Sequence, residues 1–126
     1  MSKKIHYHDT DCGGVVYYAN YLKYFEEART EFMSVRGVDI GELAKKGTLF
    51  VVRKVEIDYK SPAHYGDNLT IFTMIIKIKN VSLEFFQEAK RDSKVLAYAK
   101  TKLVCIGNDF SPKALSPKVA QCLKNE

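Results

Sequence analysis

The residues best suited to chemistry lie in one short stretch near the start of the chain, residues 8–21, HDTDCGGVVYYANY. The stretch combines two carboxylates, a Gly-Gly pair and the beginning of a predicted helix. The first amides of a helix have no partner within the helix and carry a partial positive charge, so they can hold an oxyanion. A carboxylate folded back toward them by Gly13 and Gly14 would complete a minimal apparatus for acyl-transfer hydrolysis. One group attacks or deprotonates water, and the other stabilises the tetrahedral intermediate.

The same residue types also fit a structural interpretation. Aspartates commonly cap turns, and Asp9 and Asp11 stand beside turn-forming glycines. His6, His8 and Cys12 add metal-ligand types, but no further histidine lies nearby in the sequence, so we expect no metal site. Cys12 would need His6 or His8 as its base, and it ranks below Asp11 as the group that carries chemistry.

The elements that position this stretch follow from the spacing of apolar residues. Apolar side chains recur at steps of three and four over residues 18–36, which predicts one long helix that ends at Gly37. From residue 49 the period becomes two, which indicates strands. The remaining predicted elements are strands over 3–8, 49–60, 70–79, 83–89 and 95–106, a helical turn between Gly41 and Gly47, and a short helix after Pro117. One long helix against about five antiparallel strands is an α+β architecture, expected to form a single domain over residues 1–126.

The sequence also predicts how the strands are arranged. The last three are joined by short turns and are expected to form an antiparallel meander. Residues 70–78 are apolar on both faces, which predicts a central strand covered by the helix on one face. A second subunit is the simplest cover for the other face.

Composition limits the function classes. With 126 residues, 46% hydrophobic and 28% charged, the chain suits one globular domain. No apolar run approaches the ~20 residues of a membrane span, and no signal-peptide pattern follows Met1, so a cytoplasmic location is expected. Three widely spaced cysteines support neither a disulfide framework nor a structural zinc site. A net charge of +5 attracts anions, but the lysines are scattered, which favours a solvated basic surface over a nucleic-acid interface.

Several motifs together resemble one known family. Residues 7–11 (YHDTD), 14–18 (GVVYY), 19–21 (ANY) and 25–29 (FEEAR) are similar to the hotdog-fold acyl-CoA thioesterases of the 4-hydroxybenzoyl-CoA thioesterase type, and in particular to their Tol-Pal-associated, YbgC-like branch. Tyr59, Pro62-Ala63 and Gly66-Asp67 support the resemblance. It implies a sheet wrapped around the long helix, and a homodimer or homotetramer with sites at the subunit interface. It also implies hydrolysis of an acyl-CoA to a free acid and coenzyme A without a metal or redox cofactor.

The resemblance also implies catalytic roles for individual residues. Asp11 would be the catalytic carboxylate, either as a nucleophile through a mixed anhydride or as a general base for water. The backbone amide of Tyr18 would polarise the thioester carbonyl, and Gly14 would shape the approach. Glu26 or Glu27 could assist, because other hotdog branches place their carboxylate on the helix, although surface ion pairs are the commoner role of such glutamates.

Substrate-binding residues are also implied. Lys79 and Ser82 match positions that bind the nucleotide end of coenzyme A, although only Lys79 of the family's basic cluster keeps its charge here. An aromatic cluster could line an acyl pocket or, as is commoner for aromatic residues at helical spacing, pack in the core: Tyr17, Tyr18, Tyr21, Tyr24 and Phe25. The family's association with envelope and phospholipid-synthesis proteins leaves an alternative function open, a non-catalytic scaffold for an acyl chain or a protein.

Overall fold

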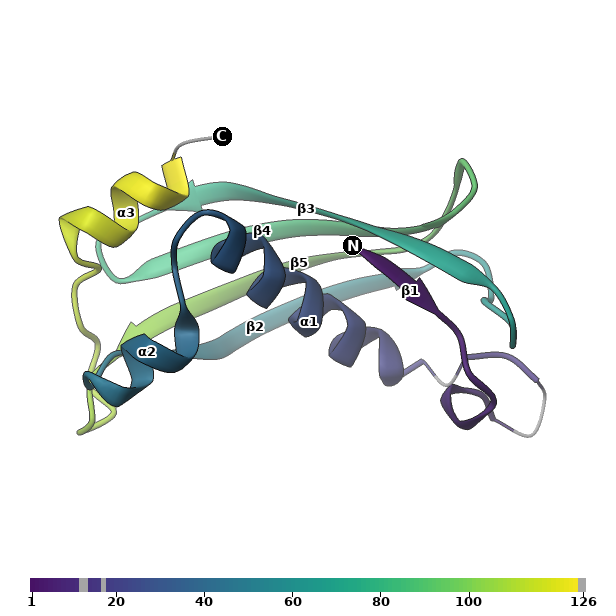
Figure 1. The fold of residues 1–126 in the computed structure, drawn as a ribbon, viewed down its shortest axis with the longest axis horizontal. Coiled ribbons are helices and arrows are strands. Elements are labelled where there is room, and N and C mark those ends of the chain that lie inside the picture. Colours follow the sequence, from purple (N-terminus) through teal and green to yellow (C-terminus); the bar gives the residue numbers. More distant parts are fainter. Residues whose placement is uncertain (12–13, 17, 125–126) are drawn as a thin grey trace.

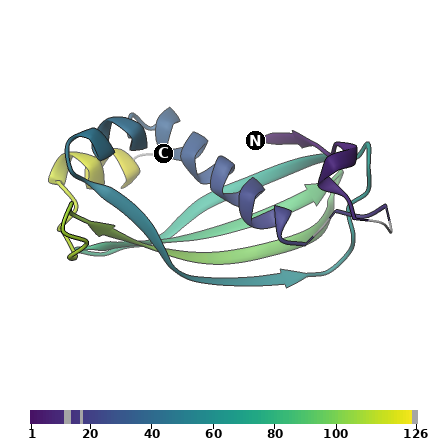
Figure 2. The ribbon, with the colours of Figure 1, turned by 90° about the horizontal axis from the view of Figure 1, so that it is seen from below.

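Two layers make up the structure: one curved antiparallel sheet and the helices that lie on one side of it (Figures 1 and 2). This computed structural model describes residues 1–11, 14–16 and 18–124, and within them the sheet has five strands in the order β1-β3-β4-β5-β2. The strands are β1 (Ser2–Lys4), β2 (Leu49–Tyr59), β3 (Asn68–Ile78), β4 (Ser82–Arg91) and β5 (Lys94–Ile106). The helices are α1 (Asn20–Val35), α2 (Ile40–Lys45) and α3 (Pro117–Lys124), and one 3₁₀ turn, η1, spans Tyr7–Asp9. The predicted α+β architecture is confirmed.

Helix α1 crosses the concave face of the sheet (Figure 2). Its buried apolar residues are Tyr21, Tyr24, Phe25, Ala28 and Met33, and the first four recur at steps of three and four. Tyr18, Leu22 and Val35, which also belong to the predicted apolar pattern, are exposed, so the buried stripe lies partly at other positions of the helix than predicted. Small buried residues on the facing strands pack in the same cluster as the rings: Ala89, Ala97 and Ala99. Large side chains against small ones let the helix pack closely on the sheet.

The end of α1 is set by Gly37, as the sequence predicts. Gly37 has a φ of +86°, a left-handed conformation that favours glycine. Its N–H donates to the Ser34 carbonyl (3.0 Å), and the N–H of Val38 donates to the Met33 carbonyl (2.9 Å). These two bonds form a Schellman motif, which satisfies the last carbonyls of the helix.

The arrangement of the strands confirms one prediction and corrects another. Strands β3, β4 and β5 form the expected meander, while β2 pairs with β5 at the far edge of the sheet. β3 is central only at its start, because the three-residue β1 pairs with Asn68–Thr70 alone. Beyond Ile71, which bonds to Met1, the rest of β3 has no strand beside it on that side within the described chain.

A buried polar link joins α1 to the sheet. Arg29 is only 6% exposed, and its Nη1 donates to Oε1 of the fully buried Gln87 on β4 (3.1 Å). Gln87 Nε2 donates to the Phe25 carbonyl (2.9 Å) and to Thr73 Oγ1 (3.0 Å). Burial lowers the pKa of Arg29, and the nearby charge of Glu26 opposes that shift. Gln87 therefore satisfies a buried cation and ties the helix to both β3 and β4.

Candidate active site

The loop that carries Asp11 is held against the β2–β3 connection. Val16 donates its N–H to the Ala63 carbonyl (2.7 Å), and Val15 forms a β-bridge with His64. The loop closes on itself, because the Asp11 N–H donates to the Val15 carbonyl (2.9 Å). Residues far apart in the sequence therefore fix the place of Asp11.

Gly14 allows the tight turn in this loop. Its φ is +78°, and its N–H donates to the Asp11 carbonyl (3.1 Å). A Cβ at this position would meet no atom within 4 Å, so the requirement for glycine comes from the backbone conformation and not from crowding. The predicted role of Gly14 in shaping the loop has this conformational basis.

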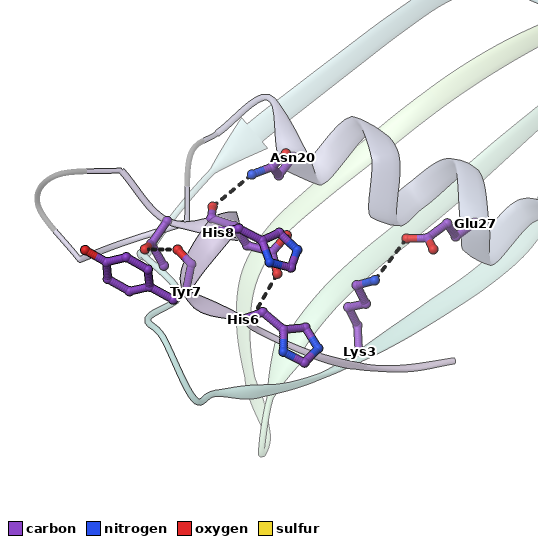
Figure 3. A network of polar contacts seen from close by, with 8 residues as sticks. Lys3, His6, Tyr7, His8, Asn20 and Glu27 are labelled. Carbon is purple, nitrogen blue, oxygen red and sulfur yellow. Dashed lines mark hydrogen bonds and ion pairs between the residues drawn. The ribbon is translucent and has the colours of Figure 1, made fainter.

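The two aspartates of the motif have different surroundings. Asp9 is buried, with an exposed fraction of 3%, whereas Asp11 is exposed. The Asp9 carboxylate accepts the N–H of His6 (2.9 Å), and its backbone carbonyl accepts Asn20 Nδ2 at the start of α1 (2.8 Å; Figure 3). Asp9 therefore fits the structural interpretation, as an anchor between η1 and α1, and Asp11 is the carboxylate left at the surface of the loop.

The pKa of Asp9 agrees with this structural role. Burial alone raises the pKa of its carboxyl, but the His6 N–H, the Tyr24 hydroxyl and the positive charges of His8 and Lys3 outweigh burial and bring it below its ordinary value. His8 Nε2 lies 3.7 Å from the Asp9 carboxylate. Asp9 is thus kept ionised as part of the fold.

The start of α1 lies beside this loop. The helix begins at Asn20, two residues after Tyr18, whose carbonyl accepts the N–H of Tyr21 (3.2 Å) in the first turn. The N-cap residue is Ala19, and no described side chain caps the helix there; its first turn contains no acidic residue. Alanine is a poor N-cap residue, because its side chain has no oxygen that could accept from the first amides of α1.

A cavity of about 280 Å³ opens next to the helix start. Its lining comes from the Asp11 loop, the first turns of α1, and the end of β2 with the residues that follow: Val16, Tyr18, Tyr21, Tyr59, Lys60, Ser61 and Pro62. Of the predicted aromatic cluster, Tyr18 and Tyr21 line this cavity, Tyr24 and Phe25 pack in the core, and Tyr17 lies outside the described residues.

A larger groove, of about 620 Å³, lies between α1, β3 and α3. Its described lining contains neither a carboxylate nor a cysteine thiol, and Phe32 and Arg36 contribute its helix side. The described lining of this groove therefore offers no carboxylate for the predicted chemistry, and the cavity next to the Asp11 loop is the better candidate for the reaction.

An ion pair supports the β2–β3 connection from behind. Asp67 accepts Arg91 Nη1 (2.8 Å) and the backbone N–H of His64 (2.8 Å). Burial raises the pKa of Asp67, but these two donors and their charges bring it below its ordinary value. The same connection presents Ala63 to the Asp11 loop, so Asp67 and Arg91 help to place Asp11 indirectly. Only the Gly66-Asp67 pair in the sequence signalled this role.

Lys79 and Ser82 lie at the opposite end of the sheet. They form the turn after β3, where the Lys79 N–H donates to the Ser82 carbonyl (2.8 Å), and Ser82 is buried. The Asp11 loop packs near the start of β3, which is 11 residues long. At about 3.3 Å per residue, roughly 30 Å separates the two ends of this strand. One protomer alone does not bring these residues to Asp11.

The remaining candidate groups have ordinary structural contacts. Glu27 forms an ion pair with Lys3 of β1 (3.4 Å; Figure 3). This is the surface role predicted for such glutamates, although the partner lies on β1 and not on the helix itself. The rings of His6 and His8 stack at 5.5 Å, and the described residues contain no group of three or more His, Cys, Asp or Glu suited to a metal ion. Of the helices in the described part of the chain, none is long and apolar enough to cross a membrane.

Comparisons with known proteins test the family resemblance. The family model of the thioesterase-like superfamily matches residues 5–123. The acyl-CoA thioester hydrolase YbgC of Escherichia coli O6:H1 is 35% identical over 118 residues, which cover 92% of this chain and 88% of that protein. A probable thioesterase from Bartonella henselae has a TM-score of 0.88 and 32% identity, and the match covers 92% of this chain and 97% of that one.

A further solved structure bears on the fold alone. The DHNA-CoA thioesterase of Staphylococcus aureus has a TM-score of 0.94 at 24% identity, over 98% of this chain and 87% of that one. The hotdog fold and the resemblance to YbgC-like proteins are confirmed, and the chain belongs to the thioesterase-like superfamily.

Proposed function

We propose that the chain hydrolyses an acyl-CoA thioester to a free carboxylic acid and coenzyme A, with Asp11 as the catalytic carboxylate. The observation that carries the proposal is an exposed carboxylate on the loop that leads into α1, where Val16 of the same loop and Tyr18 at the helix start line one cavity. Asp11 itself is not among the residues that line this cavity. The 35% identical relative from Escherichia coli is the acyl-CoA thioester hydrolase YbgC, which supports the substrate class.

The proposed reaction uses two groups of the chain. The thioester oxygen points toward the backbone amide of Tyr18 at the positive end of α1, which stabilises the charge that develops on it. In one route the Asp11 carboxylate attacks the carbonyl carbon, coenzyme A leaves as the thiolate, and water hydrolyses the resulting mixed anhydride. In the other route Asp11 removes a proton from water as the water oxygen attacks the carbonyl carbon. The tetrahedral intermediate then breaks its C–S bond, and the departing coenzyme A thiolate takes the proton from Asp11. Neither route needs a metal or redox cofactor.

The two routes predict different isotope labels. A single turnover in ¹⁸O-water puts the label into the product acid if Asp11 is a general base. If Asp11 is the nucleophile and water attacks the aspartyl carbon of the anhydride, the label appears in the Asp11 carboxylate. Water attack on the acyl carbon would instead label the acid, so repeated turnovers and trapping of the anhydride by hydroxylamine complete the comparison.

The proposal includes a homodimer or homotetramer in the cytoplasm. Lys79 and Ser82 lie at the opposite end of the sheet from the Asp11 loop, so they could contact the same coenzyme A only if a partner subunit supplies them. β2 has no strand beside it on its outer side within the described chain, and Val51 and Val52 on it are 39% and 51% exposed. Envelope or phospholipid-synthesis proteins are possible further partners.

The decisive experiment separates the enzyme from a non-catalytic scaffold of the same fold. The protein is mixed with a panel of acyl-CoAs of different chain length and aromaticity, and free thiol is measured over time. Multiple turnovers on at least one member support hydrolysis. Stoichiometric binding without thiol release would support the scaffold and overturn the proposal.

A further inference from the structure

Tyr59 reaches the first turn of α1 from the last position of β2. Its hydroxyl donates to the Tyr18 carbonyl at 3.2 Å, across 41 residues of sequence. The ring contacts Tyr18 (centroids 5.9 Å apart) and Tyr21 (5.6 Å), and all three side chains line the cavity beside the helix start. The backbone of the next residues is fixed as well, because Lys60 and Ser61 both donate N–H groups to the Leu96 carbonyl.

The Tyr18 carbonyl oxygen accepts two hydrogen bonds, and the one from Tyr59 is the second. The Tyr18 carbonyl already accepts the N–H of Tyr21 (3.2 Å), and a carbonyl has two lone pairs. Two donors from different directions fix the plane of the peptide that joins Tyr18 to Ala19. The proposed oxyanion donor, the Tyr18 N–H, belongs to the preceding peptide, so the fixed Tyr18 carbonyl limits its direction through the two backbone torsions of Tyr18.

The orientation of this peptide matters because Ala19 provides no capping side chain. The Tyr59 hydroxyl on the Tyr18 carbonyl and Asn20 Nδ2 on the Asp9 carbonyl are two described side-chain anchors of the helix start. A stabilising amide must be oriented before the charge develops in order to lower the barrier to reaction. A frayed first turn would place its amides less accurately.

We infer that Tyr59 is a positioning residue for the proposed hydrolysis, and that its hydroxyl holds the first turn of α1 with its amides aimed at the thioester oxygen. The inference rests on the proposed function. Tyr59 acts through the Tyr18 peptide, so its loss should slow the chemical step more than it weakens substrate binding.

The test is the Tyr59→Phe variant, which removes the hydroxyl and keeps the ring contacts. Tyr98→Phe is the matched control, because the Tyr98 hydroxyl donates to Asp58 (2.8 Å), its partner across β2 and β5, and Tyr98 does not itself line the cavity. Phenylalanine keeps the ring on which Lys60 lies. Both variants and the wild type are assayed for thiol release with the acyl-CoA that the wild type hydrolyses fastest. Thermal unfolding and light scattering check the fold and the oligomer.

The expected result is a roughly three- to tenfold lower kcat for Tyr59→Phe, the range for one neutral hydrogen bond, with KM changed less than twofold. Its thermal midpoint should stay close to that of Tyr98→Phe, whose kcat should match the wild type. An unchanged kcat in Tyr59→Phe, or an equal loss in both variants, would overturn the inference while the proposed function stands. A wild type without thiol release would overturn both.

Discussion

Replacing Asp9 by alanine should destabilise the fold, although this aspartate stands only two residues from Asp11. The Asp9 carboxylate is 4% exposed and accepts the His6 N–H at 2.9 Å, a charge-assisted bond with little solvent screening. Bonds of this kind contribute about 1.5–3 kcal/mol. The variant also removes the carboxylate that interacts with the buried Tyr24 hydroxyl, while it relieves the cost of burying a charge. We expect a loss of about 2–3 kcal/mol in the free energy of unfolding.

The assay is urea denaturation at neutral pH, and an m-value equal to that of the wild type checks that the variant unfolds in the same two-state manner. Asp11→Ala is the matched control, because the contacts of an exposed carboxylate are screened by solvent and their loss should change the free energy of unfolding by about 1 kcal/mol at most. For a chain of this length, the Asp9 variant should melt on the order of 10 °C below the wild type.

The difference in unfolding free energy between Asp9→Ala and the wild type should also depend on pH. The pKa of Asp9 is lowered in the folded state from its ordinary value of 3.8, so its contribution is complete above that value. It is lost as the pH falls through the lower folded-state pKa, and the gap between variant and wild type should therefore narrow in acid. Equal stability of Asp9→Ala and wild type at neutral pH, or a greater loss in Asp11→Ala, would refute this division of roles.

Three further predictions follow from contacts elsewhere. Gln87→Leu removes three hydrogen bonds of the link between α1 and the sheet and should lower the free energy of unfolding by about 3 kcal/mol in urea titrations. Adding Arg29→Met removes the buried cation that is left without its acceptor, and should recover more than about 1 kcal/mol of that loss. A double variant no more stable than Gln87→Leu would contradict this. The pKa of Asp67 is lower in the folded state than its ordinary value of 3.8, so the Asp67 carboxylate stabilises the fold fully above that value and loses this effect as the pH falls through the folded-state pKa. The difference in melting temperature between wild type and Arg91→Gln should therefore be smaller at pH 3 than at pH 7. A difference that does not depend on pH would count against the ion pair. Gly14→Ala should cost about 1–2 kcal/mol in denaturation, from the positive φ alone, and a more stable variant would show that the turn has a different conformation.

Local sequence patterns predicted the elements of this fold well, because the spacing of apolar residues reports which face of each element is buried. The steps of three and four in α1 and the glycine at its end both appear in the structure. The neighbours of each strand were less predictable. β2 pairs with β5, and β1 is too short to cover β3. Both features depend on contacts between segments that are distant in the sequence.

The candidate site shows the same limit. Asp9 and Asp11 are the same residue type two positions apart, and only the folded contacts of His6 and Asn20 separate the anchor from the exposed carboxylate. The sequence marks Tyr59 as an apolar position of a strand and as part of the family resemblance, but not as a partner of the helix. Its hydrogen bond to the start of α1 spans 41 residues, and no local pattern reports such a contact.

The measurement that tests the central claim most directly is thioester hydrolysis by Asp11→Asn, a variant with nearly the same shape and no carboxylate. We expect it to unfold at the wild-type temperature and to release thiol at least about a hundredfold more slowly than the wild type, as the loss of a general base or nucleophile requires. A folded Asp11→Asn protein that hydrolyses acyl-CoA at a rate close to the wild type would show that another group carries the reaction.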